Sequence, residues 1–254
     1  MRKRRKKLGK LSARRVGRWA LVAVAAWLGV TVSAAFVLRF VDPPSSSLML
    51  QRQLAAWLQG QRGFVLKQHW VPLAKLPSYV SVAVLSSEDQ RFFQHRGFDV
   101  TEITHAVADH LDGEPLRGAS TLSQQVAKNM FLWEGRSFVR KALEAYWTVL
   151  IEFMWPKSRI LELYLNIAEF GPGVFGVGAA ARYHFDCEAK QLSAEQAALL
   201  AAILPSPLKR SARQPSPRVL HKQQWILEQM PGLAQTRELA ALRTQSYVQR
   251  SPAR

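Results

Sequence analysis

The segment EDQRFFQHRG, residues 88–97, places two carboxylates, two aromatic rings and one imidazole within ten positions. If the segment continues a helix, Glu88, Phe92 and His95 lie at i, i+4 and i+7 on one face, and Gly97 ends the turn. A carboxylate with an aromatic neighbour and an imidazole nearby can have a pKa tuned for acid–base chemistry. An ordinary amphipathic helix end shows the same pattern, so the segment alone leaves both interpretations open.

The segment RGASTLSQQVAKN, residues 117–129, predicts a helix whose start suits an anion. Thr121 caps this helix and Gln124 reaches back from three positions later, which is the capping-box arrangement. Free backbone N–H groups near Ser120 would suit a phosphate, and Lys128 follows Gln124 by one turn on the same face. The alternative is a normal capped helix with a solvated polar side, because capping alone is not specific.

The segment GRSFVRKALEA, residues 135–145, places Arg136, Arg140 and Glu144 at i, i+4 and i+8 of a helix. An Arg140–Glu144 pair on a surface would contribute little. Two carboxylates, Glu88 and Glu144, separated by cations and a phosphate-binding helix start nevertheless fit attack at a sugar carbon that carries a diphosphate. The attacking hydroxyl needs a base, and the departing diphosphate needs fixed positive charge.

The N-terminus combines a basic tail with an apolar stretch. Residues 1–18 hold ten Lys or Arg and no acid, and residues 19–38 carry no charge. Twenty helical residues span roughly 30 Å, the thickness of the hydrocarbon core of a bilayer. The positive-inside rule predicts a cytoplasmic N-terminus, with everything after residue 40 on the other side. A cleaved signal peptide is the alternative, because Val32-Ser33-Ala34 resembles a cleavage site. The basic run also suggests nucleic acid, but the adjoining anchor favours a flank beside an anionic membrane surface.

From residue 75 onward, helical periodicity dominates, and no two runs predict a convincing hairpin. The expected fold class is mostly α. Helices are expected at 48–60, 77–94, 100–111, 121–132, 137–154, 158–169, 176–184, 193–203 and 215–230, with 63–73 as a short strand or extended arm. The expected organisation is a basic tail at 1–18, a transmembrane helix at 19–39, a linker and jaw segment at 40–72, a catalytic domain at 73–210 and a basic C-terminal helical tail at 211–254.

Several other chemistries have weak support in the sequence. Cys187 is the single cysteine, which excludes an internal disulfide framework and a multi-cysteine metal site. GPGVFG at 171–176 matches a dinucleotide-binding pattern but lacks the strand–helix–strand context. Residues 206–209 match SxxK without a later KTG. The six histidines show no metal-binding spacing, so no metal site is expected.

Five segments, in consecutive order over residues 75–208, resemble the motifs of the glycosyltransferase family that polymerises lipid II into peptidoglycan glycan strands. The segments are EDQRFFQHRG, GASTLSQQVAKN, RKALE, RILELYLN and LSAEQAALLAAILPSP. Five ordered motifs are far more specific than any one of them. The chain is most similar to the monofunctional members, which lack a transpeptidase domain. The resemblance implies a lysozyme-like, mostly helical fold with a small membrane-proximal jaw subdomain.

The resemblance also implies roles for individual residues. Glu88 would be the general base that deprotonates the 4-hydroxyl of the acceptor lipid II sugar, and Glu144 would assist at the donor side, near the diphosphate or a bound cation. The reaction would invert an α-linked donor into a β-1,4 bond. The residues expected to hold substrate are Lys128, Arg136, Arg140, Ser120, Gln124 and Gln125, and those expected to shape the first motif are Asp89, Phe92 and His95. No cofactor is required, although Mg or Mn could accompany the diphosphate.

The implied partners are lipid II, the growing glycan strand and the membrane, with cell-wall synthesis and division proteins as further candidates and no nucleic acid. The implied location is the bacterial inner membrane, with a periplasmic catalytic domain. A group of apolar residues after the anchor either rests in the membrane interface or forms the jaw core: Leu48, Met49, Leu50, Leu54, Trp57, Leu58 and Phe64. Two other functions remain open, a lysozyme-like lytic hydrolase and a non-catalytic membrane scaffold of cell-wall assembly.

Overall fold

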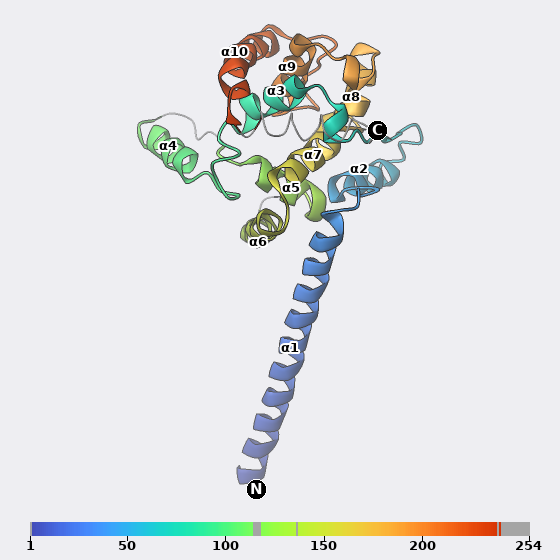
Figure 1. Cartoon of the computed structure of the whole chain (residues 1–254). Helices are drawn as coiled ribbons and strands as arrows, with labels where there is room; N and C mark the ends of the chain where they lie inside the picture. Colours follow the sequence, from blue (N-terminus) through green and yellow to red (C-terminus); the bar gives the residue numbers. More distant parts are fainter. Residues whose placement is uncertain (1, 114–117, 136, 238, 240–254) are drawn as a thin grey trace, which may run out of the picture. The chain divides into compact units, whose positions relative to one another are not determined.

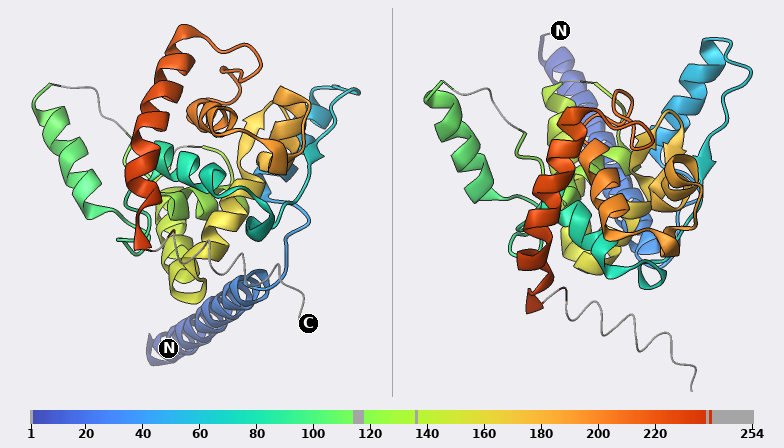
Figure 2. Two further views of the ribbon diagram at one scale, coloured as in Figure 1. Left: turned by 45° about the horizontal axis from the view of Figure 1, so that its top comes forward. Right: turned by 90° about the horizontal axis from the view of Figure 1, so that it is seen from above.

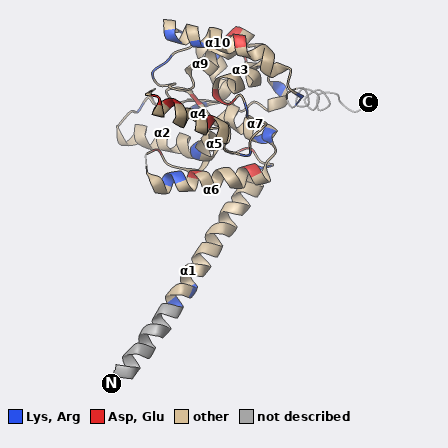
Figure 3. Cartoon of the chain, turned by 90° about the vertical axis from the view of Figure 1, so that its left-hand side faces the viewer, with Lys and Arg blue, Asp and Glu red and all other residues tan. Residues whose placement is uncertain are grey.

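The structure is a computed structural model that describes residues 2–113, 118–135, 137–237 and 239, with the backbone alone for 2–14. It contains two compact units, Met1–Pro43 and Pro44–Arg254. The first unit is built on helix α1, Arg2–Leu38. Within the described residues, Arg15–Leu38 is the one helical stretch long and apolar enough to cross a membrane, with a mean hydropathy of 2.3. Figure 3 shows this part of α1 without charged residues beyond its basic start, which confirms the predicted apolar N-terminal helix.

The second unit is mostly helical, as expected (Figure 1). Its α-helices are α2 (Ser47–Leu58), α3 (Ser78–Glu88), α4 (Val100–Leu111), α5 (Leu122–Phe131), α6 (Phe138–Met154), α7 (Lys157–Ile167), α8 (Gly176–Phe185), α9 (Ala194–Ile203) and α10 (Pro217–Ala234). Its shorter elements are the 3₁₀ helices η1 (Leu73–Lys75) and η2 (Ala189–Gln191) and the strands β1 (Lys67–Gln68), β2 (Glu169–Gly171) and β3 (Val174–Phe175).

Local sequence signals explain where several helices begin. Thr121 caps α5, because its hydroxyl accepts the Gln124 N–H while the Gln124 side chain accepts the Thr121 N–H. This confirms the predicted capping box. Ser137 caps α6 by accepting the Arg140 N–H, and Asp99 caps α4 in the same way.

The first-motif segment does not continue α3. The predicted helix over 77–94 is too long, because α3 ends at Glu88 and Asp89 leaves the helical conformation with φ −162° and ψ 77°. Glu88, Phe92 and His95 therefore do not share a helical face, and that prediction is wrong. The physical reason is that Asp89 is hydrogen-bonded to the start of α5 (below), and this tertiary contact outweighs a weak local helical preference.

Gly97 lies in the irregular segment between α3 and α4. Its φ is +92°, and a Cβ atom at this position would lie 2.7 Å from Cγ2 of Thr148. The turn therefore requires glycine both for its backbone conformation and for the close approach of α6.

The small sheet has the strand order β1-β3-β2, with β1 parallel and β2 antiparallel to β3. The expectation that no hairpin would form is wrong, since β2 and β3 form one around Gly173, which has φ +70°. Strands of two and three residues are too short to show a periodic pattern. The sheet joins the extended segment before α3 to the GPG turn, with Lys67 opposite Val174.

Helix α7 is the centre of the core, with eight of its eleven residues buried. It packs against α5, α6 and α8, while α3 packs against α9. Helix α10 lies along α3 and α9, as both views of Figure 2 show. These contacts hold the two motif helices α3 and α5 in place, which fixes the side chains at their ends.

Candidate active site

Two adjacent cavities meet at a hydrogen bond between Glu88 and Gln125. The first, called here the Glu88 cavity, has a volume of about 480 Å³. Its lining includes Glu88, Asp89, Ser120, Thr121, Lys222 and Trp225. The second, called here the Lys128 cavity, has a volume of about 580 Å³. Its lining includes Gln125, Lys128, Asn129, Arg140, Tyr164 and Arg52.

Glu88 is the last residue of α3, and its carboxyl group faces the first cavity. Its Oε2 accepts a hydrogen bond from Gln125 Nε2 at 3.1 Å, and its Oε1 accepts one from Ser87 Oγ at 3.1 Å. Burial raises the pKa of this carboxyl group, and the two hydrogen bonds and the charge of Lys222 offset part of that rise. A carboxyl group with a raised pKa and a restrained orientation is suited to accept a proton.

Gln125 is itself oriented by Tyr164. The Tyr164 hydroxyl donates to Gln125 Oε1 at 3.3 Å, so the amide nitrogen of Gln125 points toward Glu88. Burial raises the pKa of Tyr164 well above its ordinary value, which keeps the hydroxyl protonated and able to donate. A chain of two hydrogen bonds thus runs from the core helix α7 to the Glu88 carboxylate.

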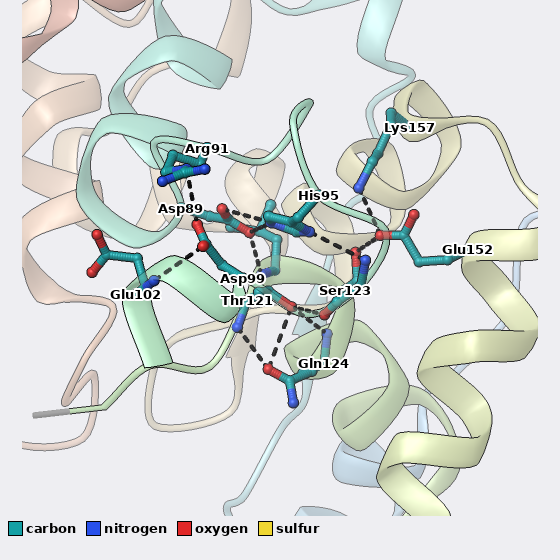
Figure 4. A network of polar contacts seen from close by, with 12 residues as sticks. Asp89, Arg91, His95, Asp99, Glu102, Thr121, Ser123, Gln124, Glu152 and Lys157 are labelled. Atoms are coloured by element: carbon teal, nitrogen blue, oxygen red, sulfur yellow. Dashed lines mark hydrogen bonds and ion pairs between the residues drawn. The ribbon is translucent and has the colours of Figure 1, made fainter. Parts of the chain in front are cut away.

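Asp89 joins the first-motif segment to the second. Its carboxylate accepts the Leu122 N–H at 2.9 Å and a hydrogen bond from His95 Nε2 at 3.0 Å. The Gly97 N–H donates to His95 Nδ1 at 3.1 Å, so Nε2 carries the proton. Phe92 is fully buried beneath these groups. Figure 4 shows how the network around Asp89 and His95 meets the capped start of α5.

The second half of the same network lies on α6. Glu152 accepts hydrogen bonds from Ser123 Oγ and from Lys157 Nζ, the latter at 2.7 Å. The Lys157 ammonium group also lies 4.4 Å from the centre of the Phe92 ring. These contacts hold α5 and α6 against the first-motif segment (Figure 4).

The structure places the substrate-binding residues expected from the sequence in different parts of the site. Ser120 lines the Glu88 cavity, whereas Gln125, Lys128 and Arg140 line the Lys128 cavity. Gln124 lines neither cavity, because its side chain is turned back into the helix cap. Arg136 lies outside the described residues.

Glu144 is buried on α6 and lies in neither cavity. Its two oxygens bind Arg140 at 2.8 Å and Lys141 at 2.5 Å. Lys128 lies nearby and is exposed, and partial desolvation lowers the pKa of its ammonium group while the charge of Glu144 offsets part of that decrease. Glu144 therefore supplies the negative charge that keeps a cluster of cations together beside the second cavity.

Two groups of cavity residues were not expected from the sequence. Arg52 on α2 binds Glu134 at 2.9 Å and Glu169 at 3.0 Å, and all three line the Lys128 cavity. Lys222 and Trp225 on α10 line the Glu88 cavity. No local pattern identifies either group, because each pairs segments that are far apart in the chain.

A family model described as Transglycosylase matches residues 56–231 of this chain. The chain belongs to the transglycosylase family. Curated relatives named biosynthetic peptidoglycan transglycosylase match it over most of their length. One from Pseudomonas aeruginosa is 52% identical over 204 residues, which cover 80% of this chain and 88% of the relative. One from Cronobacter sakazakii is 50% identical over 219 residues, covering 86% and 91%. One from Yersinia pestis is 48% identical over 216 residues, covering 85% and 90%.

Membership of the transglycosylase family makes this chain a glycosyltransferase enzyme, as the motifs implied. The helical second unit contains the lysozyme-like transglycosylase domain, which the family model matches at residues 56–231. The residues named above for the Glu88 cavity all lie inside the matched range, including those of α10, whereas Arg52 precedes it.

Proposed function

We propose that this transglycosylase is a peptidoglycan glycosyltransferase that polymerises lipid II into β-1,4-linked glycan strands and releases undecaprenyl diphosphate. The observation that carries the proposal is the contact between Glu88 and Gln125, which places a carboxyl base and a cation-lined cavity side by side. The names of the curated relatives support peptidoglycan as the product.

In the proposed reaction, the acceptor sugar occupies the Glu88 cavity and the donor diphosphate occupies the Lys128 cavity. The acceptor 4-hydroxyl oxygen forms a bond to C1 of the donor sugar while the bond from C1 to the diphosphate oxygen breaks. Glu88 takes the hydroxyl proton. The electron pair leaves with the diphosphate, whose charge is stabilised by Lys128 and Arg140. Attack from the side opposite the leaving group inverts the donor carbon.

Glu144 has a supporting part in this proposal. Because both of its oxygens bind cations, it is placed to keep Arg140 correctly directed at the second cavity rather than to meet the sugar. Asp89 and His95 are also positioning residues in this proposal, because they hold the turn after Glu88 against α5.

Tyr164→Phe should lower the rate of strand synthesis roughly 2- to 10-fold. One neutral hydrogen bond contributes about 0.5–1.5 kcal/mol, and here its loss would free the Gln125 amide to turn away from Glu88. Initial rates with labelled lipid II, together with circular dichroism to confirm the fold, would measure this effect. An unchanged rate in a folded variant would show that Tyr164 does not orient Gln125.

The residues of the Lys128 cavity do not fit a protein-bound divalent cation. Both carboxylates in its lining, Glu134 and Glu169, already bind Arg52. Within the described residues, no group of three His, Cys, Asp or Glu side chains is placed to hold a metal. The proposed reaction therefore has no step through a cation held by the protein.

We infer that α1 anchors the enzyme in the bacterial inner membrane with its basic N-terminus in the cytoplasm and its catalytic domain in the periplasm. The apolar residues after the anchor divide into two sets, since Leu48 and Met49 are buried while the side chains on the outer face of α2 are exposed. The exposed side chains are Leu50, Leu54, Trp57 and Leu58. They support contact with the membrane interface, where a lipid-linked substrate resides. Protease added to spheroplasts should digest the catalytic domain, and protection of that domain would reverse the proposed orientation.

The proposed function is tested by incubating the detergent-solubilised full chain with labelled lipid II and separating the products by size. A ladder of polymer is expected. Shortening of preformed glycan while lipid II stays intact would instead identify a lytic hydrolase. If neither substrate changes, a non-catalytic scaffold role would replace the proposal.

A further inference from the structure

Helix α10 contributes one wall of the Glu88 cavity although it lies outside all five motifs. Its apolar face is buried against α3 and α9 through Val219, Ile226 and Met230. Lys222 and Trp225 are three positions apart and so lie on one side of the helix, and both line the cavity that contains Glu88. The packing of α10 on α3, whose last residue is Glu88, fixes these two side chains relative to the carboxyl group.

Among the described residues that line this cavity, Lys222 is the cation without a carboxylate partner. Arg91, which also lines the cavity, is paired with Asp99 at 3.4 Å. Among the described residues, the Lys222 ammonium group forms no ion pair with a carboxylate, and it lies 3.7 Å from the centre of the Trp225 ring. Burial lowers the pKa of Lys222, and the charge of Glu88 offsets part of that decrease.

An indole ring and a cation next to a base can together bind a sugar that carries an anionic group. The apolar C–H face of a sugar ring can pack on an aromatic ring. An ammonium group stacked on such a ring has three N–H donors, so it can bind an anionic group at the same time. Each group is partly buried and lines a cavity large enough for a sugar. The lining of the Lys128 cavity includes neither residue, so their role differs from that of the diphosphate-binding cations.

We propose that Lys222 and Trp225 bind the acceptor, with Trp225 packed against the sugar whose hydroxyl reaches Glu88 and Lys222 bound to an anionic group on the same acceptor molecule. This inference rests on the proposed function. It adds α10 to the substrate-binding surface and makes the enzyme's preference for its acceptor depend on a helix that the motifs do not include.

The test compares Lys222→Met, Lys222→Arg and Trp225→Leu in the full-length protein. The donor is a short lipid-linked glycan whose terminal 4-hydroxyl is blocked, and the acceptor is a lipid II analogue whose bond from C1 to the diphosphate cannot be cleaved, so that each can act in one role alone. His221→Ala is the matched control, since His221 is the exposed neighbour of Lys222 and does not line the cavity. Binding of this lipid II analogue is also measured by calorimetry in a Glu88→Gln background, where no turnover occurs.

Lys222→Met and Trp225→Leu should each raise the KM for the acceptor about 10-fold, an effect in the range of one charge-assisted contact. They should weaken calorimetric binding by a similar factor and leave the donor KM and kcat within about 2-fold. Lys222→Arg should restore most of the acceptor affinity, and His221→Ala should match the wild type.

Three outcomes would overturn the inference: an unchanged acceptor KM, a raised donor KM, or a reduced kcat with a shifted pH profile at constant acceptor KM. The last would mean that Lys222 acts through the ionisation of Glu88. Failure of the proposed function looks different, because the wild-type protein itself would then form no polymer. To separate the possible anions, the lipid II analogue is compared with and without its carboxylate-bearing peptide. Loss of the Lys222 effect in the peptide-free analogue would assign the carboxylate as the bound anion, and its persistence there would assign the acceptor's diphosphate.

Discussion

Replacing Glu88 by Gln should abolish detectable strand synthesis while the protein stays folded. A general base typically contributes 10²- to 10⁴-fold in rate, and an amide cannot accept the hydroxyl proton. The substituted side chain keeps the shape of glutamate and retains an oxygen that can accept the hydrogen bond now made by Gln125. Initial rates of lipid II polymerisation, measured beside the wild type, give the size of the loss.

The stability of Glu88→Gln provides the control for this result. Burial raises the pKa of Glu88 in the folded state, so the folded protein binds this proton more tightly than the unfolded chain. The stability contributed by the neutral carboxyl group is therefore lost as pH rises through the folded-state pKa. At pH 7 the amide removes this cost, and the thermal midpoint in detergent should equal or exceed that of the wild type. Near-normal synthesis by the folded variant would exclude Glu88 as the base.

The pH dependence of wild-type activity should reflect the ionisation of Glu88. Only the ionised carboxylate accepts a proton, so activity should fall as pH is lowered through the pKa of Glu88. Because burial raises this pKa above 4.5, the fall should begin at a higher pH than an ordinary glutamate would cause.

Replacing Lys128 by Met should lower strand synthesis about 10²- to 10³-fold, the effect expected when a fixed donor to a developing negative charge is removed. Lys128 is exposed to solvent and lines the second cavity, where a diphosphate would accumulate charge as it leaves. Methionine keeps the length of the aliphatic stem, so the loss would report the ammonium group rather than a packing defect. Single-turnover rates with saturating lipid II would separate this effect from weaker binding.

Lys141→Met is the matched control for Lys128→Met. Lys141 binds Glu144, whose charge also acts on Lys128, at 2.5 Å. Its side chain is 53% exposed and does not line the cavity. Its replacement should change the rate by less than about 3-fold, since exposed ion pairs contribute little. Equal losses in the two variants would mean that the cations act only by balancing Glu144, and the diphosphate role of Lys128 would then be wrong.

The sequence by itself determined the features that depend on short stretches of chain. Helical periodicity and the Thr121–Gln124 cap located α5, and an uncharged run located the apolar part of α1. Five ordered motifs identified the family that the comparisons confirm. These features follow from interactions between residues a few positions apart, and such interactions are visible in a local window.

Only the tertiary structure decided how the site is assembled. Helix α3 stops at Glu88 because Asp89 bonds to Leu122, 33 positions later, and no pattern within α3 contains that contact. The contacts that tie Arg52 to the second cavity span 82 and 117 positions.

Tertiary packing also decides the roles of Glu144 and of helix α10. Spacing placed Glu144 near the cations but did not show that both of its oxygens are engaged by them, and this depends on the rotamers that packing permits. Lys222 reaches the Glu88 cavity because the buried face of α10 packs on α3 and α9. Which residues meet across such a cavity is set by the packing of whole helices, and a single sequence records the apolar face of each helix but not its partner.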